Sequence, residues 1–280
     1  MPLTTTGELV TRAHAARTAV AAFNIITLEH VEAVIEGAES AGASVVLQVS
    51  ENAVRFRQGR LLPLARAAAV AAERAAVPVA LHLDHVQSAA LLGQAADAGF
   101  SSVMYDASRL PYAENLAATR TAVDRAHAQG LWIEAELGEI GGKGPHVPGA
   151  RTDPAEARAF VAESGVDALA VAIGSVHAMT ARTAALDHDL LERLSRALDV
   201  PLVLHGSSGV PDGELTAAVA GGITKVNIGT ALNQAMTGAI REHLETHPDA
   251  VDARSYLSAG REAMARTVER IVTGVGLTLV

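Results

Sequence analysis

The stretch Val77-Pro78-Val79-Ala80-Leu81-His82-Leu83-Asp84-His85 decides the fold class of this chain. It is apolar up to Leu83, apart from His82, and then ends in two polar residues. A continuous apolar run, unlike an alternating one, is typical of a strand in a parallel sheet that is buried on both faces. In folds built on such sheets, functional groups gather where the strands end. The stretch therefore predicts both a buried strand and a site at its carboxyl end.

Runs of the same kind recur along the whole chain and alternate with helical patterns. We predict strands at 20–25, 44–49, 78–84, 101–106, 131–136, 167–173, 201–205 and 223–228. We predict helices at 28–41, 61–76, 88–98, 111–129, 154–164, 187–198, 212–220 and 230–247. Eight β-α units predict an α/β protein, a closed (β/α)8 TIM barrel that occupies residues 1–280 as a single domain. One more helix, near 255–272, is expected at the C-terminus.

Composition excludes several classes of function. Of the 280 residues 49% are hydrophobic, and the net charge is −9, which disfavours nucleic acid and anionic membranes as partners. The chain has no cysteine, so any transition metal must bind His, Asp or Glu. We find no signal peptide and no apolar run long enough to cross a membrane, which predicts a cytoplasmic protein.

Three histidines follow predicted strands and should meet at one rim of the barrel: His85, His177 and His205. Three neutral imidazoles with an open fourth position form a catalytic zinc site. A single histidine is more often a core or surface residue whose hydrogen bonds are satisfied. Three of them at strand ends of one barrel favour the zinc site.

Two Gly- and Ser/Thr-containing turns follow the last two strands, at Gly206-Ser207-Ser208-Gly209 and Asn227-Ile228-Gly229-Thr230. Glycine lets the backbone approach an anion closely, and hydroxyl and N–H groups donate hydrogen bonds to it. Most such turns are only turns. The loops after strands 7 and 8 are, however, the usual phosphate site of this barrel, so we predict a phosphate here.

Acidic residues lie at the same rim. Asp84, beside His85, could move a proton on a substrate hydroxyl, or it could orient a ligand histidine. Asp106 and Glu136 could hold a second or displaced cation, or pair with a lysine such as Lys225. A zinc ion that polarises a carbonyl, a phosphate clamp and a carboxylate together suit reversible carbon–carbon cleavage of a ketose phosphate.

With these motifs the sequence resembles the class II, zinc-dependent ketose-bisphosphate aldolases, in their fructose- and tagatose-bisphosphate branch. The resemblance covers nearly the whole chain. It rests on the segments 22–24 (AFN), 82–85 (HLDH), 103–108 (VMYDAS), 134–138 (EAELG), 141–142 (GG), 167–174 with His177, 205–209 (HGSSG) and 225–230 (KVNIGT). Each segment is modestly specific, but their order and their places at strand ends are highly specific.

The resemblance implies a lyase that cleaves fructose 1,6-bisphosphate to dihydroxyacetone phosphate and glyceraldehyde 3-phosphate. Zn²⁺ would bind His85, His177 and His205, and Asp84 would exchange a proton with the C4 hydroxyl. Asp106 and Glu136 match positions that hold a second divalent cation in some members, and a monovalent cation (Na⁺ or K⁺) near the phosphate is common. Substrate-binding positions would be Asn24, Ser50, Ala178, Gly206, Ser207, Ser208, Asn227, Ile228, Gly229 and Thr230.

Two features depart from the family. The second zinc histidine is usually followed by Gly and shortly by Tyr, whereas here His177 is followed by Ala178, Met179 and Thr180. The Gly-rich connection 138–152 usually carries acidic residues just after its paired glycines, one of which is taken as the base at C3. None follows Gly142, and Glu139 and His146 are the nearest substitutes.

Other functions remain open at this stage. The substrate could be tagatose 1,6-bisphosphate or another phosphorylated ketose, because the two bisphosphates differ only in configuration at C4. The same residues could serve a barrel metallohydrolase, although that enzyme has no need of phosphate loops. A non-catalytic sugar-phosphate binder is the third alternative. Family resemblance suggests a homodimer or homotetramer, with the helix near 255–272, preceded by Arg254, as a candidate subunit contact.

Overall fold

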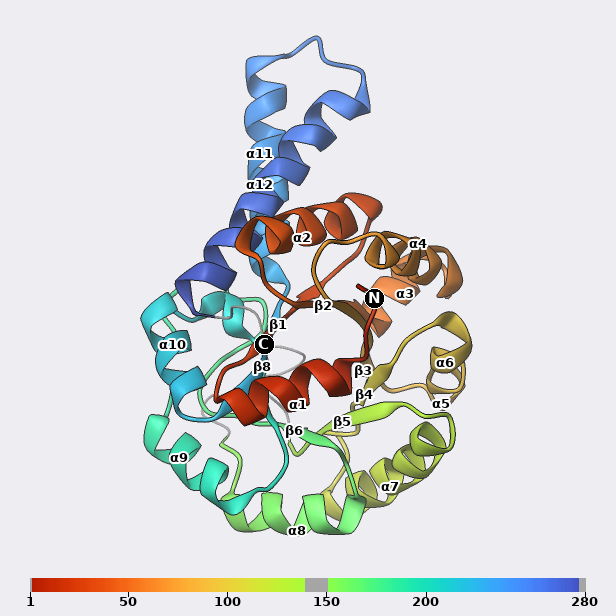
Figure 1. Ribbon diagram of the computed structural model, residues 1–280, viewed down its shortest axis with the longest axis vertical. Helices are drawn as coiled ribbons and strands as arrows, with labels where there is room; N and C mark the ends of the chain where they lie inside the picture. The colour runs from red at the N-terminus through yellow and green to blue at the C-terminus, as the bar shows by residue number, and fades with distance from the viewer. Residues whose placement is uncertain (1, 139–150, 277–280) are drawn as a thin grey trace.

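The structure, a computed structural model, describes residues 2–138 and 151–276. Eight parallel strands close into a barrel in the order β1-β2-β3-β4-β5-β6-β7-β8, with β8 pairing back to β1. Helices surround this barrel as a ring (Figure 1). The predicted (β/α)8 TIM barrel is confirmed.

The strands lie close to the predicted ranges. They are β1 (Val20–Asn24), β2 (Val45–Ser50), β3 (Val79–Val86), β4 (Ser102–Tyr105), β5 (Trp132–Glu136), β6 (Ala168–Ala170), β7 (Leu202–Leu204) and β8 (Ile223–Ile228). The helices are α1 (Thr6–Ala16), α2 (Leu28–Ala41), α3 (Glu51–Phe56), α4 (Leu62–Glu73), α5 (Ala89–Leu92), α6 (Ala95–Ala98), α7 (Tyr112–Ala128), α8 (Pro154–Ser164), α9 (His188–Ala197), α10 (Asp212–Ala220), α11 (Thr230–Thr246) and α12 (Ala253–Gly274), with a 3₁₀ turn, η1 (Ser207–Gly209).

Several elements differ from the predictions. The single helix expected at 88–98 is two short ones, α5 and α6, separated at Gly93, whose backbone lies against the guanidinium of Arg125. Strand β6 is three residues long instead of seven. Helices α1 and α3 and the turn η1 were not predicted. Most of these elements are short, so hydrophobic periodicity gives little signal for them. Helix α1 instead precedes the first strand and lies outside the strand–helix alternation on which the prediction rests.

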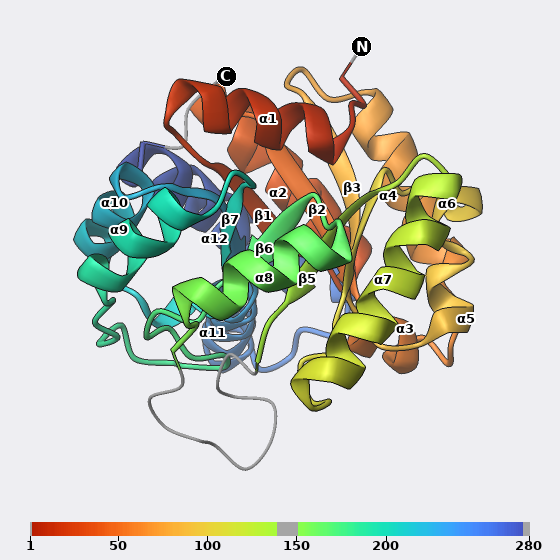
Figure 2. The same ribbon diagram turned by 90° about the horizontal axis from the view of Figure 1, so that it is seen from below.

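Helix α1 covers the amino end of the barrel (Figures 1 and 2). Its Leu9 and Val10 pack on the small side chains inside that end, which include Val20, Ala22 and Val46. Its first residue, Thr6, accepts a 2.6 Å hydrogen bond from Ser102 Oγ at the start of β4. Helix α1 therefore covers this end of the barrel, opposite the carboxyl ends of the strands.

The last two helices form a hairpin that projects from one side of the ring (Figure 1). Helix α12 confirms the predicted extra C-terminal helix, and it packs closely on α2. A Cβ atom at Gly37 of α2 would lie 2.4 Å from the carbonyl oxygen of Ala265, so glycine permits this contact. Within residues 2–138 and 151–276, no helix is both long and apolar enough to cross a membrane.

Candidate active site

Three imidazoles meet at the carboxyl end of the barrel. His85 comes from β3, His177 from the segment after β6, and His205 from the residue that follows β7. Their ring centroids lie 4.7 to 5.7 Å apart in edge-to-face pairs, and one ring nitrogen of each lies within 4.8 Å of the others. The structure thus brings together the three histidines that the sequence selected.

The backbone of β3 turns His85 toward this cluster. His85 has a φ of +49°, in the left-handed region that non-glycine residues rarely adopt. The β3–β4 register shifts between Leu83 and Val86, which is a bulge next to the site. Bulges change the direction of a side chain and are frequent beside active sites. The bulge therefore places the adjacent side chains of Asp84 and His85 in one site.

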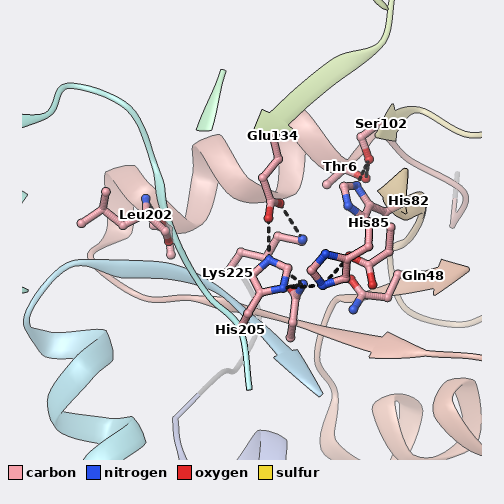
Figure 3. A network of polar contacts seen from close by, with 12 residues as sticks. Thr6, Gln48, His82, His85, Ser102, Glu134, Leu202, His205 and Lys225 are labelled. Atoms are coloured by element: carbon pink, nitrogen blue, oxygen red, sulfur yellow. Dashed lines mark hydrogen bonds and ion pairs between the residues drawn. The ribbon is translucent and has the colours of Figure 1, made fainter. Parts of the chain in front are cut away.

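Hydrogen bonds define which ring nitrogens face the centre of the cluster. Nδ1 of His85 lies 3.1 Å from Asp106 Oδ2, and Nε2 of His205 lies 2.7 Å from Glu134 Oε1. The remaining two nitrogens, His85 Nε2 and His205 Nδ1, face each other at 3.0 Å (Figure 3). Burial, and then the neighbouring His85, lower the pKa of His205 well below its usual range, so its imidazole is neutral. Neutral imidazole donors fit zinc, which takes nitrogen ligands.

A second group with metal-ligand spacing shares one of these histidines. Ligand atoms of His85, Asp106 and Glu136 also lie within 4.8 Å of one another. The alternative, a pair between these carboxylates and Lys225, is wrong, because the Lys225 ammonium lies 2.8 Å from Glu134 Oε2 instead. Glu134 and Glu136 both point into the barrel, but Glu134 lies two residues deeper, at the level of Lys225.

Asp84 is buried beside the histidines and is held by the amide of Asn24, which is itself held by the amide of Gln48. Asn24 Nδ2 donates to Asp84 Oδ2 at 2.9 Å, and Gln48 Nε2 donates to Asn24 Oδ1 at 3.0 Å. Among the described residues, no hydrogen-bond donor reaches Asp84 Oδ1. Burial alone would raise the pKa of Asp84, but the imidazoles of His85 and His205 lower it below the usual range. Asp84 is therefore a carboxylate with one oxygen oriented and the other available.

A cavity of about 210 Å³ opens beside Asp84, His85, His177 and His205. Most of the predicted substrate-binding residues line it: Asn24, Ser50, Ala178, Gly206, Ser208, Asn227, Gly229 and Thr230. Ser207 and Ile228 do not; they lie at a neighbouring cavity behind η1, and Ser207 Oγ donates to the carbonyl of Asn227. Asp106 and Glu136 lie beside His85 outside this lining.

Sequence reasoning missed three lining residues and one buried pair. Ile26, Asn52 and Asn233 also line the cavity. Asn52 follows Ser50 by two residues, and Asn233 follows Thr230 by one helical turn. Both could have been found by considering residues close in sequence to the predicted site residues. The pair of Glu134 and Lys225 was missed because its partners are 91 residues apart. Glu139 and His146, the substitutes considered for the base at C3, lie outside the described residues, as does Gly142.

Ala178 has a φ of +60°. An L-residue in this left-handed conformation costs about 1–2 kcal/mol, whereas glycine adopts it freely but loses about 0.5–1 kcal/mol through unfolded-state entropy. We expect Ala178→Gly to raise the free energy of unfolding by about 0.5–1 kcal/mol. Urea denaturation measures this free energy. The control Ala181→Gly changes a residue of the same segment that has no positive φ, so it should be neutral or destabilising. Equal effects of the two substitutions would contradict backbone strain at Ala178.

His82, fully buried in the barrel, gives a pH dependence. Burial, followed by the Lys225 charge, lowers the His82 pKa from 6.5 to about 3. Below pH 6.5 the unfolded chain binds a proton at this residue that the folded chain does not, so stability falls as pH falls toward 3. The contribution is up to about 1.4 kcal/mol per pH unit. We expect His82→Asn to make the free energy of unfolding depend less on pH between about pH 6 and 4. Denaturation at a series of pH values measures this dependence. The control variant His243→Asn, on exposed α11, should keep the pH dependence of the wild type.

Comparisons with known proteins all point to one family. The model of the family described as "Fructose-bisphosphate aldolase class-II" matches residues 4–278. The "Probable fructose-bisphosphate aldolase" of Bacillus subtilis (strain 168) is 38% identical over 272 residues, covering 96% of this chain and 95% of that protein. The fructose-bisphosphate aldolase of Staphylococcus aureus strain Mu50 is 37% identical over 273 residues, covering 96% of each.

The fold gives the same result. The crystal structure of the YdjI aldolase from Escherichia coli K12 superposes with a TM-score of 0.85 at 31% sequence identity, covering 98% of this chain and 97% of that one. The resemblance stated from the sequence motifs is confirmed by the family match and by these relatives. With three histidines and an oriented carboxylate at the carboxyl end of its barrel, this chain belongs to the class II fructose-bisphosphate aldolase family.

Proposed function

We propose that this chain catalyses zinc-dependent, reversible aldol cleavage of a ketose 1,6-bisphosphate, with fructose 1,6-bisphosphate as the substrate. The products are dihydroxyacetone phosphate and glyceraldehyde 3-phosphate. The observation that carries the proposal is the convergence of three imidazoles and the Asp84 carboxylate on one cavity that is bordered by Gly- and Ser-containing turns. A hydrolase of phosphate-free amides would not use those turns.

His85, His177 and His205 would hold the zinc ion. The fit rests on the donor set, since the facing nitrogens of His85 and His205 lie 3.0 Å apart while their opposite nitrogens contact carboxylates. When bound, zinc supplies Lewis-acid polarisation of the ketose carbonyl. The group of His85, Asp106 and Glu136 would hold a second divalent cation.

Asp84 would move the proton of the C4 hydroxyl. In the cleavage direction its carboxylate takes that proton, the C3–C4 bond breaks, and C4 leaves as the aldehyde carbon of glyceraldehyde 3-phosphate. The electron pair stays on C3, which then takes up a proton to give dihydroxyacetone phosphate. A general base must lie within hydrogen-bond reach of the proton that it removes. Asn24 fixes one oxygen of Asp84 and leaves the other open, which suits this task.

The turns after β7 and β8 would bind the phosphate of the triose half. Gly206, Ser208, Gly229 and Thr230 line the cavity at the beginning of α11. A helix N-terminus presents unpaired N–H groups and a partial positive charge to an anion. Ser207 and Ile228, whose side chains point elsewhere, would take part through their backbone only. A monovalent cation, Na⁺ or K⁺, would bind near this phosphate.

A coupled cleavage assay tests the proposal. Purified protein is given fructose 1,6-bisphosphate or, separately, tagatose 1,6-bisphosphate, and triose phosphate release is followed with chelator and after zinc is restored. We expect release that chelator abolishes and zinc recovers, with the higher rate on fructose 1,6-bisphosphate. A higher rate on the tagatose isomer would change the substrate, and no release from either sugar by zinc-loaded protein would contradict the proposal.

Three broader assignments belong to the same proposal. Residues 1–280 form one barrel domain, and the protein is a homodimer or homotetramer with α12 as a subunit contact. Sedimentation tests the assembly, and a monomer at micromolar concentration would contradict it. A cytoplasmic location stays a prediction.

A further inference from the structure

The two ring nitrogens of His205 face different kinds of partner (Figure 3). Nε2 lies 2.7 Å from Glu134 Oε1, and Nδ1 lies 3.0 Å from His85 Nε2. Asn227 Nδ2 lies 3.1 Å from Nε2 and 3.3 Å from Nδ1, so it favours neither nitrogen. Because an ionised carboxylate only accepts hydrogen bonds, Nε2 must carry the ring proton. The lone pair of Nδ1 then points toward the histidine cluster.

Glu134 is itself held from the other side. Its second oxygen, Oε2, lies 2.8 Å from the ammonium of Lys225. His205, Glu134 and Lys225 are all fully buried. Strands β5 and β8 are separated by β6 and β7 in the barrel order, so this ion pair spans the barrel interior instead of linking adjacent strands. Neither Glu134 nor Lys225 lines the cavity.

We propose that Glu134 and Lys225 are positioning residues for the metal centre. Glu134 fixes the tautomer and the orientation of His205. Lys225 balances the charge of Glu134 and binds its Oε2, so that Oε1 is left for His205. Partners of this kind keep a ligand imidazole directed at the metal, and their loss typically costs about 10–100-fold in metal affinity. The inference rests on the proposed zinc site.

A purely structural role predicts a different outcome. Replacing a buried ion pair by apolar residues of similar volume is often neutral or stabilising. In the double variant Glu134→Leu/Lys225→Met, the charge pair and the acceptor for His205 are both removed. If the pair only stabilises the fold, this variant should bind zinc as the wild type does. If Glu134 positions His205, the variant should fold normally and still bind zinc about 10–100-fold more weakly.

The measurement is the zinc dissociation constant of the apoprotein, obtained by competition with a chromophoric chelator, with circular dichroism to verify folding. The isosteric variant Glu134→Gln/Lys225→Met keeps an acceptor oxygen for His205 and should stay within about tenfold of the wild type. A matched control, Glu192→Leu/Arg196→Met, removes an exposed ion pair of α9 and should not change zinc affinity. Wild-type affinity in the folded apolar double variant would overturn the proposal.

A measurement on unmutated protein keeps the inference testable if the apolar variant does not fold. In metal-free protein labelled with ¹⁵N-histidine, the ring nitrogens of His205 report its tautomer, with the signal assigned by its loss in His205→Gln. We expect the proton on Nε2, and a proton on Nδ1 would overturn the proposal. Failure of the proposed function is distinct, because wild-type protein would then bind no zinc or release no triose phosphate whatever the tautomer.

Discussion

Asp84→Asn should lower the turnover number for ketose bisphosphate cleavage by about 100- to 10,000-fold, the usual contribution of a positioned general acid or base. The amide keeps the shape of the side chain and can still accept the hydrogen bond that Asn24 Nδ2 now donates to Oδ2. It cannot take the proton of the C4 hydroxyl at neutral pH. Steady-state kinetics with zinc-saturated protein measures the change.

Zinc affinity and substrate KM should change much less than turnover in this variant, because Asp84 is not one of the three imidazole donors. Asp124→Asn, the same chemical change on the exposed side of α7, is the matched control and should keep wild-type kinetics. A turnover number of Asp84→Asn above a tenth of the wild-type value would show that Asp84 does not transfer the proton.

His205→Ala should abolish cleavage activity and weaken zinc binding by more than about 100-fold, since even outer partners of a ligand histidine contribute about 10–100-fold. The change removes one of three nitrogens that lie within 4.8 Å of each other. It also leaves the buried oxygen Glu134 Oε1 without its imidazole partner. Competition with a chelator measures zinc affinity, and the coupled assay measures cleavage.

His243→Ala provides the control for this variant. His243 lies near the C-terminal end of α11, in the hairpin that α11 and α12 form, and its ring stacks on that of His247 with the centroids 4.5 Å apart. It should change neither zinc affinity nor cleavage. If His205→Ala retained full zinc affinity and turnover, the three-histidine site would be wrong.

The fold could be predicted from sequence because the strands of a barrel are buried on both faces, and this leaves continuous apolar runs. The predicted range 223–228 coincides with β8. The exceptions have local causes. Helix α1 precedes the first strand, outside the alternation of strands and helices that guided the prediction, and it packs on the barrel end, where Leu9 meets Val20. The bulge at His85 could not be predicted, because it is a property of the pairing between β3 and β4.

The site could be predicted where its residues follow strand ends, since chain topology alone brings those ends together. That rule found His85, His177 and His205. It did not rank residues by depth within the barrel. Glu134 and Glu136 share one face of β5. Only the register of all eight strands shows that Lys225 lies at the same depth in the barrel as Glu134.

The distribution of the site along the chain has a consequence for the order of events during synthesis. His85 is made 120 residues before His205, and Lys225 follows later still. The barrel closes only when β8 pairs with β1, which places Val20 beside Lys225. On a ribosome, the first half of the chain must therefore wait for the second before a three-histidine centre exists. A small zinc module can use its metal to nucleate folding, whereas the zinc ion that we propose for this chain would enter only an almost finished barrel.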